Sequence, residues 1–484
     1  MAYKHGVYIQ EEPTSLLPPV NVGAGLPVVF GTAPIHMTEN PSEAVNKPIL
    51  CYTYKEAVQQ LGFSTDFESF TLCEFMRSHF ALFNVAPVVF VNVLDPAEHQ
   101  ATVSGEDVTL VAGKATLAEA GALLDTIVVK DDGGSTEYEL EEDYLIQYND
   151  QGKAVILRLE GGAIPSDTAA LKVDYTHLDA AAVQASDVLG GIDPATGNAT
   201  GLELLDEVFP RFRQVPGQVL APKFSTDPAV AAVMTGKASN INEHFKAIAL
   251  VDIDTTQVEN YTDAPAFKND NNLTSEFQAV CWPKVQLGDE QFHLSTQLAG
   301  LICKVDSQND DVPHVSPSNK NIQATAAVTA SGDEVWLGPN QAAMLNGEGI
   351  ITALNFQGGW VGFGNRTGAY PANTDPKDAF LALRRMFNWI GNTLTLTFWQ
   401  RVDAPLNRRQ IDTVLDSANI WLNGLAARQF ILGGRVEFLE TENPDTDLMD
   451  GIARFHVYIT PPSPNREIDF ILEYDPAYLQ TLFG

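Results

Sequence analysis

Each end of the chain carries a strand-forming segment that has no partner strand near it in the sequence. Residues 6–10 (Gly-Val-Tyr-Ile-Gln) favour an extended conformation, and the prolines and glycines between residues 13 and 27 exclude a helix after them. Residues 467–474 (Glu-Ile-Asp-Phe-Ile-Leu-Glu-Tyr) place an apolar side chain at every second position, as a strand with one wet face does. An isolated strand is unstable in water, so both segments must pair within their own chain or with another copy. The side chains expected to form these strands are Val7, Tyr8, Ile9, Ile468, Phe470, Leu472 and Tyr474.

Between the two ends, apolar runs suited to buried strands alternate with segments of helical periodicity. This order predicts an α/β core, and its strand–helix–strand spacing indicates parallel neighbouring strands. The expected strands lie at residues 28–31, 86–93, 217–222, 247–252 and 277–285, and the expected helices at residues 56–61, 68–83, 228–240 and 292–307.

Residues 97–187 have a different texture, with short strands and turns. A hairpin turn is expected at residues 149–152, and acidic side chains gather at residues 137–143. This pattern predicts an acidic, mainly β domain inserted into the core. A solvated hairpin face with no further role is the alternative explanation for the acidic cluster.

The last part of the chain combines helices with strands. Helices are expected at residues 375–389 and 408–425, a β-branched strand at residues 393–399, and an antiparallel pair at residues 435–440 and 452–460. The predicted fold class is α/β and α+β multidomain, with an α/β core, an inserted mainly-β domain and extended terminal arms. The predicted division is an N-terminal arm (1–27), the first part of the core (28–96), the inserted domain (97–187), the second part of the core (188–355), a C-terminal domain (356–462) and a C-terminal arm (463–484).

Charge excludes several classes of partner. The chain has 29 Lys and Arg against 62 Asp and Glu, which gives a formal net charge of −33. Such an acidic protein is a poor ligand for nucleic acid or for an anionic membrane. No apolar stretch approaches the roughly 18–20 residues that span a bilayer, so no membrane insertion is expected. Four cysteines without a CxxC pair indicate buried thiols in a reducing cytoplasm rather than a disulfide framework.

Catalytic and cofactor motifs are missing from the sequence. It has no GxxxxGK[ST], no HExxH and no GxSxG, and the glycine-rich residues 362–368 have the wrong spacing for a dinucleotide site. The histidines show no metal-ligand spacing. We therefore expect no enzyme, no cofactor and no metal. A hydrolase or ligand-binding protein with an α/β core is the rival from a different class.

Several stretches resemble one known family. Residues 6–13, Gly300-Leu-Ile-Cys-Lys-Val-Asp306, Val315-Ser-Pro-Ser-Asn-Lys320, Gly358-Gly-Trp-Val-Gly-Phe-Gly-Asn-Arg-Thr367 and Arg384-Arg-Met-Phe-Asn388 occur in the order typical of contractile phage tail sheath proteins. The resemblance covers most of the chain except about residues 97–187. At Gly362-Phe363 this chain departs from the bulkier pair expected in the family.

The resemblance implies a structural subunit that forms six-fold rings stacked as a helical sheath around an inner tail tube. The terminal arms would add strands to the sheets of neighbouring subunits, and contraction would drive the tube through a bacterial envelope. The implied partners are other copies of the chain, the tail tube protein, and baseplate and tail terminator proteins. The implied location is the virion tail, assembled in the bacterial cytoplasm. The sheath of a contractile bacteriocin or extracellular injection device would look the same.

Basic residues near the C-terminus are candidates for the tube contact. Arg408, Arg409 and Arg428 lie on or after the helix expected at residues 408–425, in a very acidic chain. We expect one of them to face an acidic tube surface. Pairing within the chain, with acids such as Asp403 and Asp412, is the alternative.

Overall fold

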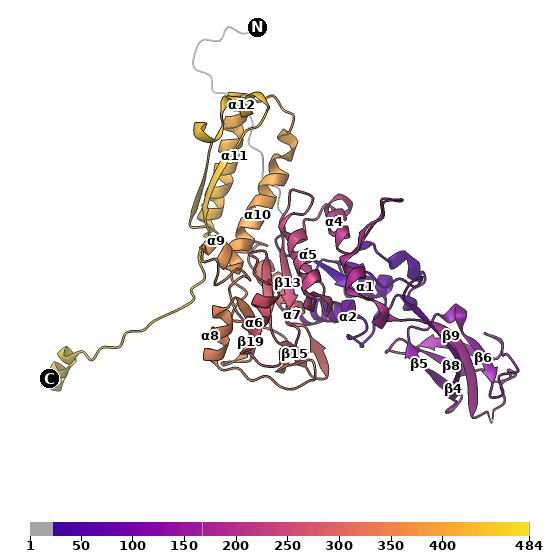
Figure 1. The fold of residues 1–484 in the computed structure, drawn as a ribbon. Coiled ribbons are helices and arrows are strands. Elements are labelled where there is room, and N and C mark those ends of the chain that lie inside the picture. Colours follow the sequence, from indigo (N-terminus) through magenta and orange to yellow (C-terminus); the bar gives the residue numbers. More distant parts are fainter. Residues whose placement is uncertain (1–22, 167, 484) are drawn as a thin grey trace, which may run out of the picture.

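A computed structural model describes residues 23–166 and 168–483 of the chain. Its centre, within that described part, is a nine-stranded sheet with helices packed against it (Figure 1). In sheet order the strands are β17 (Lys320–Asn321), β20 (Trp360–Phe363), β19 (Ile350–Asn355), β14 (Gln278–Cys281), β13 (Ile248–Asp252), β12 (Gln218–Leu220), β1 (Pro27–Gly31), β3 (Val88–Asn92) and β2 (Pro48–Cys51).

The middle of this sheet is parallel. Strands β19, β14, β13, β12, β1 and β3 all run the same way, and β2, β17 and β20 are antiparallel to their neighbours at the two sides. Parallel strands need crossover connections, and helices between the strands provide them. The main helices of this part are α1 (Tyr54–Leu61), α2 (Thr71–Met76), α4 (Leu205–Phe212), α5 (Pro228–Ser239), α6 (Ala264–Asp270), α7 (Leu294–Ser307) and α8 (Pro339–Gly347).

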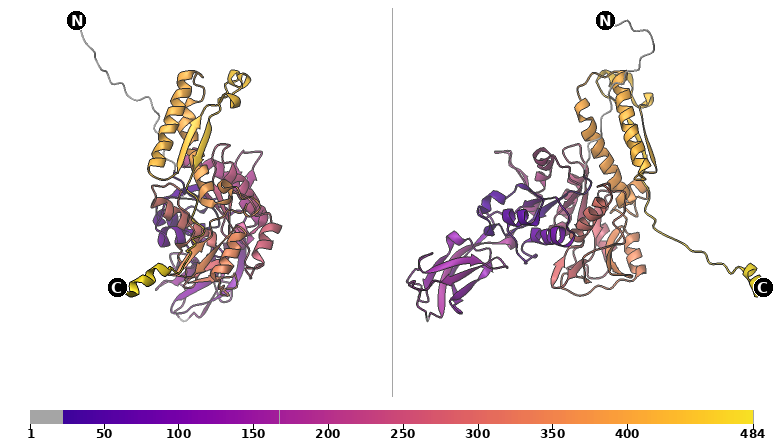
Figure 2. Two further views of the ribbon diagram at one scale, coloured as in Figure 1. Left: turned by 90° about the vertical axis from the view of Figure 1, so that its left-hand side faces the viewer. Right: turned by 180° about the vertical axis from the view of Figure 1, so that it is seen from behind.

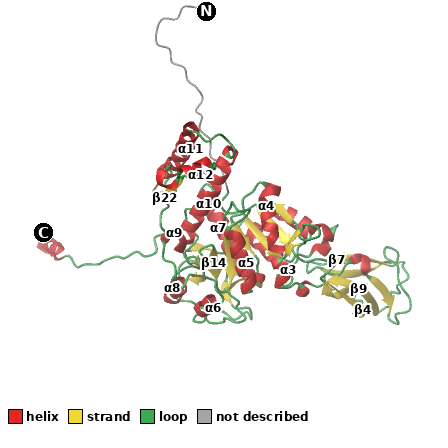
Figure 3. Ribbon diagram, turned by 45° about the horizontal axis from the view of Figure 1, so that its top comes forward, coloured by secondary structure: helices red, strands yellow, loops and turns green. Residues whose placement is uncertain are grey.

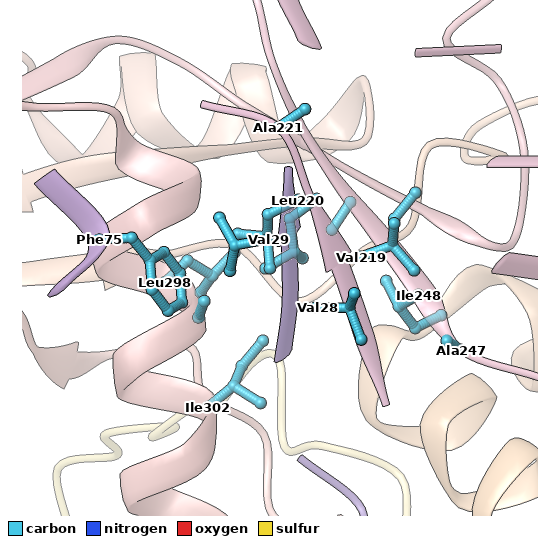
Figure 4. Packing of buried hydrophobic residues seen from close by; sticks show 14 of the residues in the cluster. Val28, Val29, Phe75, Val219, Leu220, Ala221, Ala247, Ile248, Leu298 and Ile302 are labelled. Carbon is cyan, nitrogen blue, oxygen red and sulfur yellow. The ribbon is translucent and has the colours of Figure 1, made fainter. Parts of the chain in front are cut away.

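The central strands are buried on both faces, which explains their continuous apolar sequences. In Figure 4, Val29 of β1 points toward Phe75 of α2 and Leu298 of α7, whereas Val28 and Val219 point to the opposite side. All five side chains are almost fully buried. Burying an aliphatic side chain stabilises the fold by about 1.5–3 kcal/mol, so these strands form the most stable part of the molecule.

Between Gln100 and Leu178 the chain leaves the core and forms two three-stranded sheets. Their strands lie in a separate lobe at one end of the molecule (Figure 3). Tyr144, Tyr175 and Ile156 belong to a buried apolar cluster of this lobe, distinct from the large cluster of the core. The sheets are β4 (Gln100–Thr109), β9 (Ala170–Leu178) and β6 (Val128–Asp131), and β5 (Lys114–Ala120), β8 (Lys153–Arg158) and β7 (Tyr144–Tyr148).

A helical layer with a small hairpin projects from the other side of the core (Figures 1 and 2). The long helices α10 (Leu381–Phe398) and α11 (Arg408–Ala427) lie beside each other, and the antiparallel strands β21 (Gly433–Glu437) and β22 (His456–Thr460) pack on α11. Short helices α9 (Pro376–Ala379) and α12 (Asp445–Met449) flank this layer.

The structure confirms the predicted fold class and corrects some local predictions. The strand predicted at residues 393–399 is wrong, because residues 381–398 form one continuous helix, α10. Thr395 and Thr397 donate their hydroxyl hydrogens to the carbonyls of Gly391 and Thr393, so these β-branched residues satisfy their polar groups within the helix. The strand predicted at residues 277–285 is split into β14 and β15 (Lys284–Leu287), because Pro283 has no backbone N–H for a sheet.

No helix among residues 23–166 and 168–483 is both long enough and apolar enough to cross a membrane.

Candidate assembly surfaces

The C-terminal arm leaves the body of the molecule as an extended segment. Two views show residues after β22 running away from the other elements and ending in a short helical turn (Figures 1 and 2). No strand forms between residues 461 and 475, and within the described chain no hydrogen bond joins residues 468–483 to the rest of the protein. Phe470 and Leu472 are 85% and 94% exposed. Exposed apolar side chains that lie close together in this way are typical of surfaces that bind another molecule.

The predicted arm residues behave alike where the structure describes them. Ile468, Phe470, Leu472 and Tyr474 are all exposed, and none has a strand partner among residues 23–166 and 168–483. The predicted N-terminal strand residues Val7, Tyr8 and Ile9 lie outside the described residues.

The root of the N-terminal arm is fixed to the core by hydrogen bonds. The Gly25 carbonyl accepts from Gln218 Nε2 at 2.8 Å and from Cys303 Sγ at 3.0 Å. Beside it, Arg385 of α10 forms a buried ion pair with Asp306 of α7, with Nη1 3.1 Å from Oδ1. Burial raises the pKa of the Asp306 carboxyl, and the guanidinium opposes that rise. Sheet, core helix and projecting helix therefore meet at the point where the arm begins.

The sequence motifs that carry the family resemblance meet in space. Ser318 Oγ accepts a hydrogen bond from Gly364 N at 3.0 Å, and Asn319 N donates to the Gly362 carbonyl at 2.7 Å. These contacts join the segment 315–320 to the segment 358–367. The Asp306–Arg385 pair joins the segments 300–306 and 384–388, and the segment 6–13 lies outside the described residues. The motifs are therefore packing contacts between elements rather than a catalytic constellation.

The hairpin of β21 and β22 has an open edge on β22. It is a two-stranded sheet, and no further strand of the described chain pairs with it. The Asn419 side chain on α11 bonds both backbone groups of Val436, donating to its carbonyl at 3.1 Å and accepting from its N–H at 2.9 Å. This bracket occupies the outward-facing backbone groups of Val436 and holds β21 on α11, which leaves the outer edge of β22 able to accept a strand from elsewhere.

A cavity of about 880 Å³ lies between the end of α10, the start of α11 and the hairpin. Apolar side chains form much of its wall, and Arg401 lies at its edge with a buried Nε that has no hydrogen-bond partner among the described residues. The sequence analysis missed this cavity, because Leu394 and Phe398 of its wall fall in the segment wrongly predicted as a strand. Their four-residue spacing was the available signal. The apolar lining residues are Leu394, Phe398, Val402, Ala404, Leu406, Ile411, Val414, Ala418, Val436, Ala453, Phe455 and Val457.

The three predicted tube-contact arginines are exposed, but they do not form one cluster. Arg408 begins α11, is 82% exposed and pairs with Asp412 at 3.0 Å, as the alternative explanation expected. Arg409 follows it and is also exposed. Arg428 lies at the other end of α11, over the Phe430 ring and 3.9 Å from Asp310. Exposed pairs of this kind are worth at most about 1 kcal/mol, so these guanidinium groups remain able to bind elsewhere.

No group of three metal-ligating side chains occurs in the part of the chain that the structure describes. Burial raises the pKa of the Cys51, Cys73 and Cys303 thiols to about 12, which keeps them protonated and unreactive at neutral pH.

Comparison with known proteins gives a consistent result, although no protein-family model matches the chain. A tail sheath protein of Burkholderia phage BcepMu is 29% identical over 495 residues, covering 100% of this chain and 99% of that protein. A putative prophage major tail sheath protein of Pseudomonas aeruginosa is 26% identical over 307 residues, covering 61% of this chain and 74% of that protein.

Solved structures show the same fold at low sequence identity. The contracted sheath complex of the extracellular contractile injection system PVC matches with a TM-score of 0.58 at 13% identity, covering 99% of each chain. A chain of the anti-feeding prophage baseplate matches with a TM-score of 0.57 at 13% identity, covering 98% of this chain and 100% of that chain. The predicted resemblance to contractile tail sheath proteins is therefore confirmed over the whole chain, in sequence and in fold.

Proposed function

We propose that this protein is the structural subunit of a contractile sheath, which polymerises as stacked six-fold rings around an inner tail tube and contracts to drive the tube through a bacterial envelope. The subunits are linked by terminal arms that add strands to the sheets of their neighbours. Its partners in this role are other copies, the tube protein, and baseplate and terminator proteins, and its location is the tail of the particle. The sheath of a contractile bacteriocin or of an extracellular injection device is the alternative particle for the same subunit.

The observation that carries this proposal is the C-terminal arm. Residues 467–474 place an apolar side chain at every second position as a half-buried strand does, yet these side chains are exposed and residues 468–474 form no hydrogen bond with the rest of the described chain. An edge of the β21–β22 hairpin is the acceptor, because the hairpin is the exposed two-stranded sheet nearest the arm in sequence. Backbone pairing tolerates sliding and rotation at the proline-rich root, so subunits can remain linked while they rearrange.

The domain division predicted from the sequence fits this role. The arms at residues 1–27 and 463–484 link subunits, and residues 356–462 carry the acceptor hairpin. The acidic insertion at residues 97–187 faces outward, where like charges on neighbouring subunits are best solvated. Its lobe lies at the far side of the core from the hairpin (Figure 1).

Negative-stain electron microscopy of the purified full-length protein tests the proposal. We expect tubes or stacked rings, with an inner tube when the tube protein is co-expressed. A protein that stays a soluble monomer at high concentration, with and without the tube protein, would exclude the sheath role and favour the ligand-binding alternative.

We further propose that Arg408 and Arg409 face an acidic surface of the tube. Replacing both by glutamate is expected to reduce co-sedimentation of the sheath with the tube at low salt and to abolish its salt dependence, because the attraction is screened over about 10 Å at 0.1 M salt. Arg211→Glu is the matched control, since Arg211 is also a helix residue in an exposed i,i+4 pair, with Glu207. Equal binding by the double variant and the wild type would exclude a tube contact at either arginine and leave Arg408 with only its pair to Asp412.

A further inference from the structure

The last described residues form an apolar helical turn beyond the predicted arm strand. Residues 476–483 are helical, and Tyr478, Leu479, Leu482 and Phe483 are solvent-exposed there. Leu479 and Leu482 are three residues apart and lie on one face of the turn. A strand that only added backbone hydrogen bonds would not need this apolar end, so the turn requires a separate binding surface.

The cavity between α10, α11 and β22 has an apolar wall that suits the apolar side chains of this turn. Pockets of roughly 300–1,000 Å³ enclose most of a bound small molecule, and this one measures about 880 Å³. The exposed side chains of Val402 and Leu406 extend its apolar wall to the surface. The buried Nε of Arg401 lacks an acceptor there among the described residues, and a backbone carbonyl of an incoming segment would supply one.

Pairing geometry brings the turn of one copy to the cavity of another. Residues 467–474 span about 26 Å as a strand, whereas the five residues of β22 span about 17 Å. An arm strand that pairs antiparallel to β22 therefore ends beyond the first residue of β22, His456. Phe455, Ala453 and Gly451 precede that residue and line the cavity. In its own chain the turn lies far from the hairpin (Figures 1 and 2).

We propose that residues 476–483 of one copy fill the cavity between α10, α11 and β22 of a second copy, with Leu479 and Leu482 facing its apolar wall. This contact rests on the arm exchange of the proposed function and adds to it a side-chain lock at the end of the added strand. This contact fixes the register of each arm on its neighbour, because residues 476–483 fit the cavity in one position only.

Cysteine cross-linking between two full-length variants tests the lock. One variant carries Val402→Cys at the cavity rim and the other carries Leu482→Cys in the turn, and the two are mixed before assembly and treated with a short bismaleimide. Native cysteines give little background, because Cys51, Cys73 and Cys281 are buried and burial raises the pKa of the partly buried Cys303 thiol to about 12. Both changed positions are exposed in the single chain, so folding is unaffected. Pairing Leu482→Cys with Val111→Cys, at an exposed site of the inserted lobe, is the matched control.

We expect a cross-linked dimer at about tenfold or more above the Val111 control, since docking holds the two thiols at a millimolar effective concentration. Polymers without a Val402–Leu482 cross-link would overturn the lock and leave the arm exchange standing. Cross-linking within one chain, in a dilute monomer carrying both cysteines, would also overturn it. If the wild-type protein forms no polymers, the proposed sheath function is wrong. The contact between residues 476–483 and the cavity is then wrong as well, because it depends on that function.

Discussion

Replacing Phe470 or Leu472 by aspartate is expected to abolish sheath polymers, whereas Ile471→Asp leaves most of them intact. All three side chains are almost fully exposed in the single chain, so no difference is expected from the monomer alone. In an added strand, however, Phe470 and Leu472 share the face that turns toward the neighbour, and Ile471 shares the other face with Asp469 and Glu473. The paired design therefore isolates strand formation between subunits.

The size of the effect follows from the energy of one arm. About five backbone hydrogen bonds at roughly 1 kcal/mol each give on the order of 5 kcal/mol per link. Burying each apolar side chain adds about 1.5–3 kcal/mol, and aspartate forfeits that gain and adds a buried charge. A loss of about 3 kcal/mol weakens each link more than a hundredfold. Because a sheath contains many such links, polymers disappear at concentrations where the wild type assembles fully.

Sedimentation and negative-stain microscopy measure this result, and thermal unfolding provides the control. Measured below the assembly concentration, the unfolding midpoint of every variant should equal that of the wild type, since residues 468–483 make no hydrogen bond to the body of their own described chain. Deletion of residues 463–484 should behave like Phe470→Asp. Equal effects at positions 470 and 471, or polymers that persist in the deletion, would contradict pairing of the arm.

The parallel core was predictable because strands that are buried on both faces have continuously apolar sequences. Residues 28–31 and 247–252 are apolar at nearly every position, which suits strands buried on both faces and little else. The strand predicted at residues 393–399 was wrong because the local sequence does not show how this segment is buried. Threonine favours strands on average, but Thr393 and Thr397 lie on the buried side of a long helix whose packing overrides that local preference.

The assembly surfaces were predictable only in part. The strand pattern at residues 467–474 is visible in the sequence, and it requires a partner that the neighbouring residues do not provide. The cavity is not visible, because it arises where α10, α11 and the hairpin meet without filling the space between them. Contacts between distant segments, such as Asp306 with Arg385, likewise depend on the folded topology.

Arg385→Ala is expected to lower the free energy of unfolding by about 3–5 kcal/mol, the usual cost of breaking a buried ion pair. The side chains of Arg385 and Asp306 are only 3% and 2% exposed. Without the guanidinium, the Asp306 carboxylate would be left buried and unpaired, and its pKa, already raised by burial, would rise further. A raised native pKa stabilises the fold most at low pH. The deficit relative to the wild type should therefore shrink as the pH falls.

Chemical denaturation measures the loss, and two further variants separate its causes. Arg435→Ala removes an exposed arginine paired with Glu437 at 2.7 Å and should change stability by less than about 1 kcal/mol. The double change Asp306→Leu with Arg385→Met should recover most of the loss, because apolar side chains of similar volume replace buried pairs at little cost. If the double variant is as unstable as Arg385→Ala, the stabilisation comes from the hydrogen bond that Arg385 Nη2 donates to the Ala24 carbonyl at the arm root rather than from charge pairing.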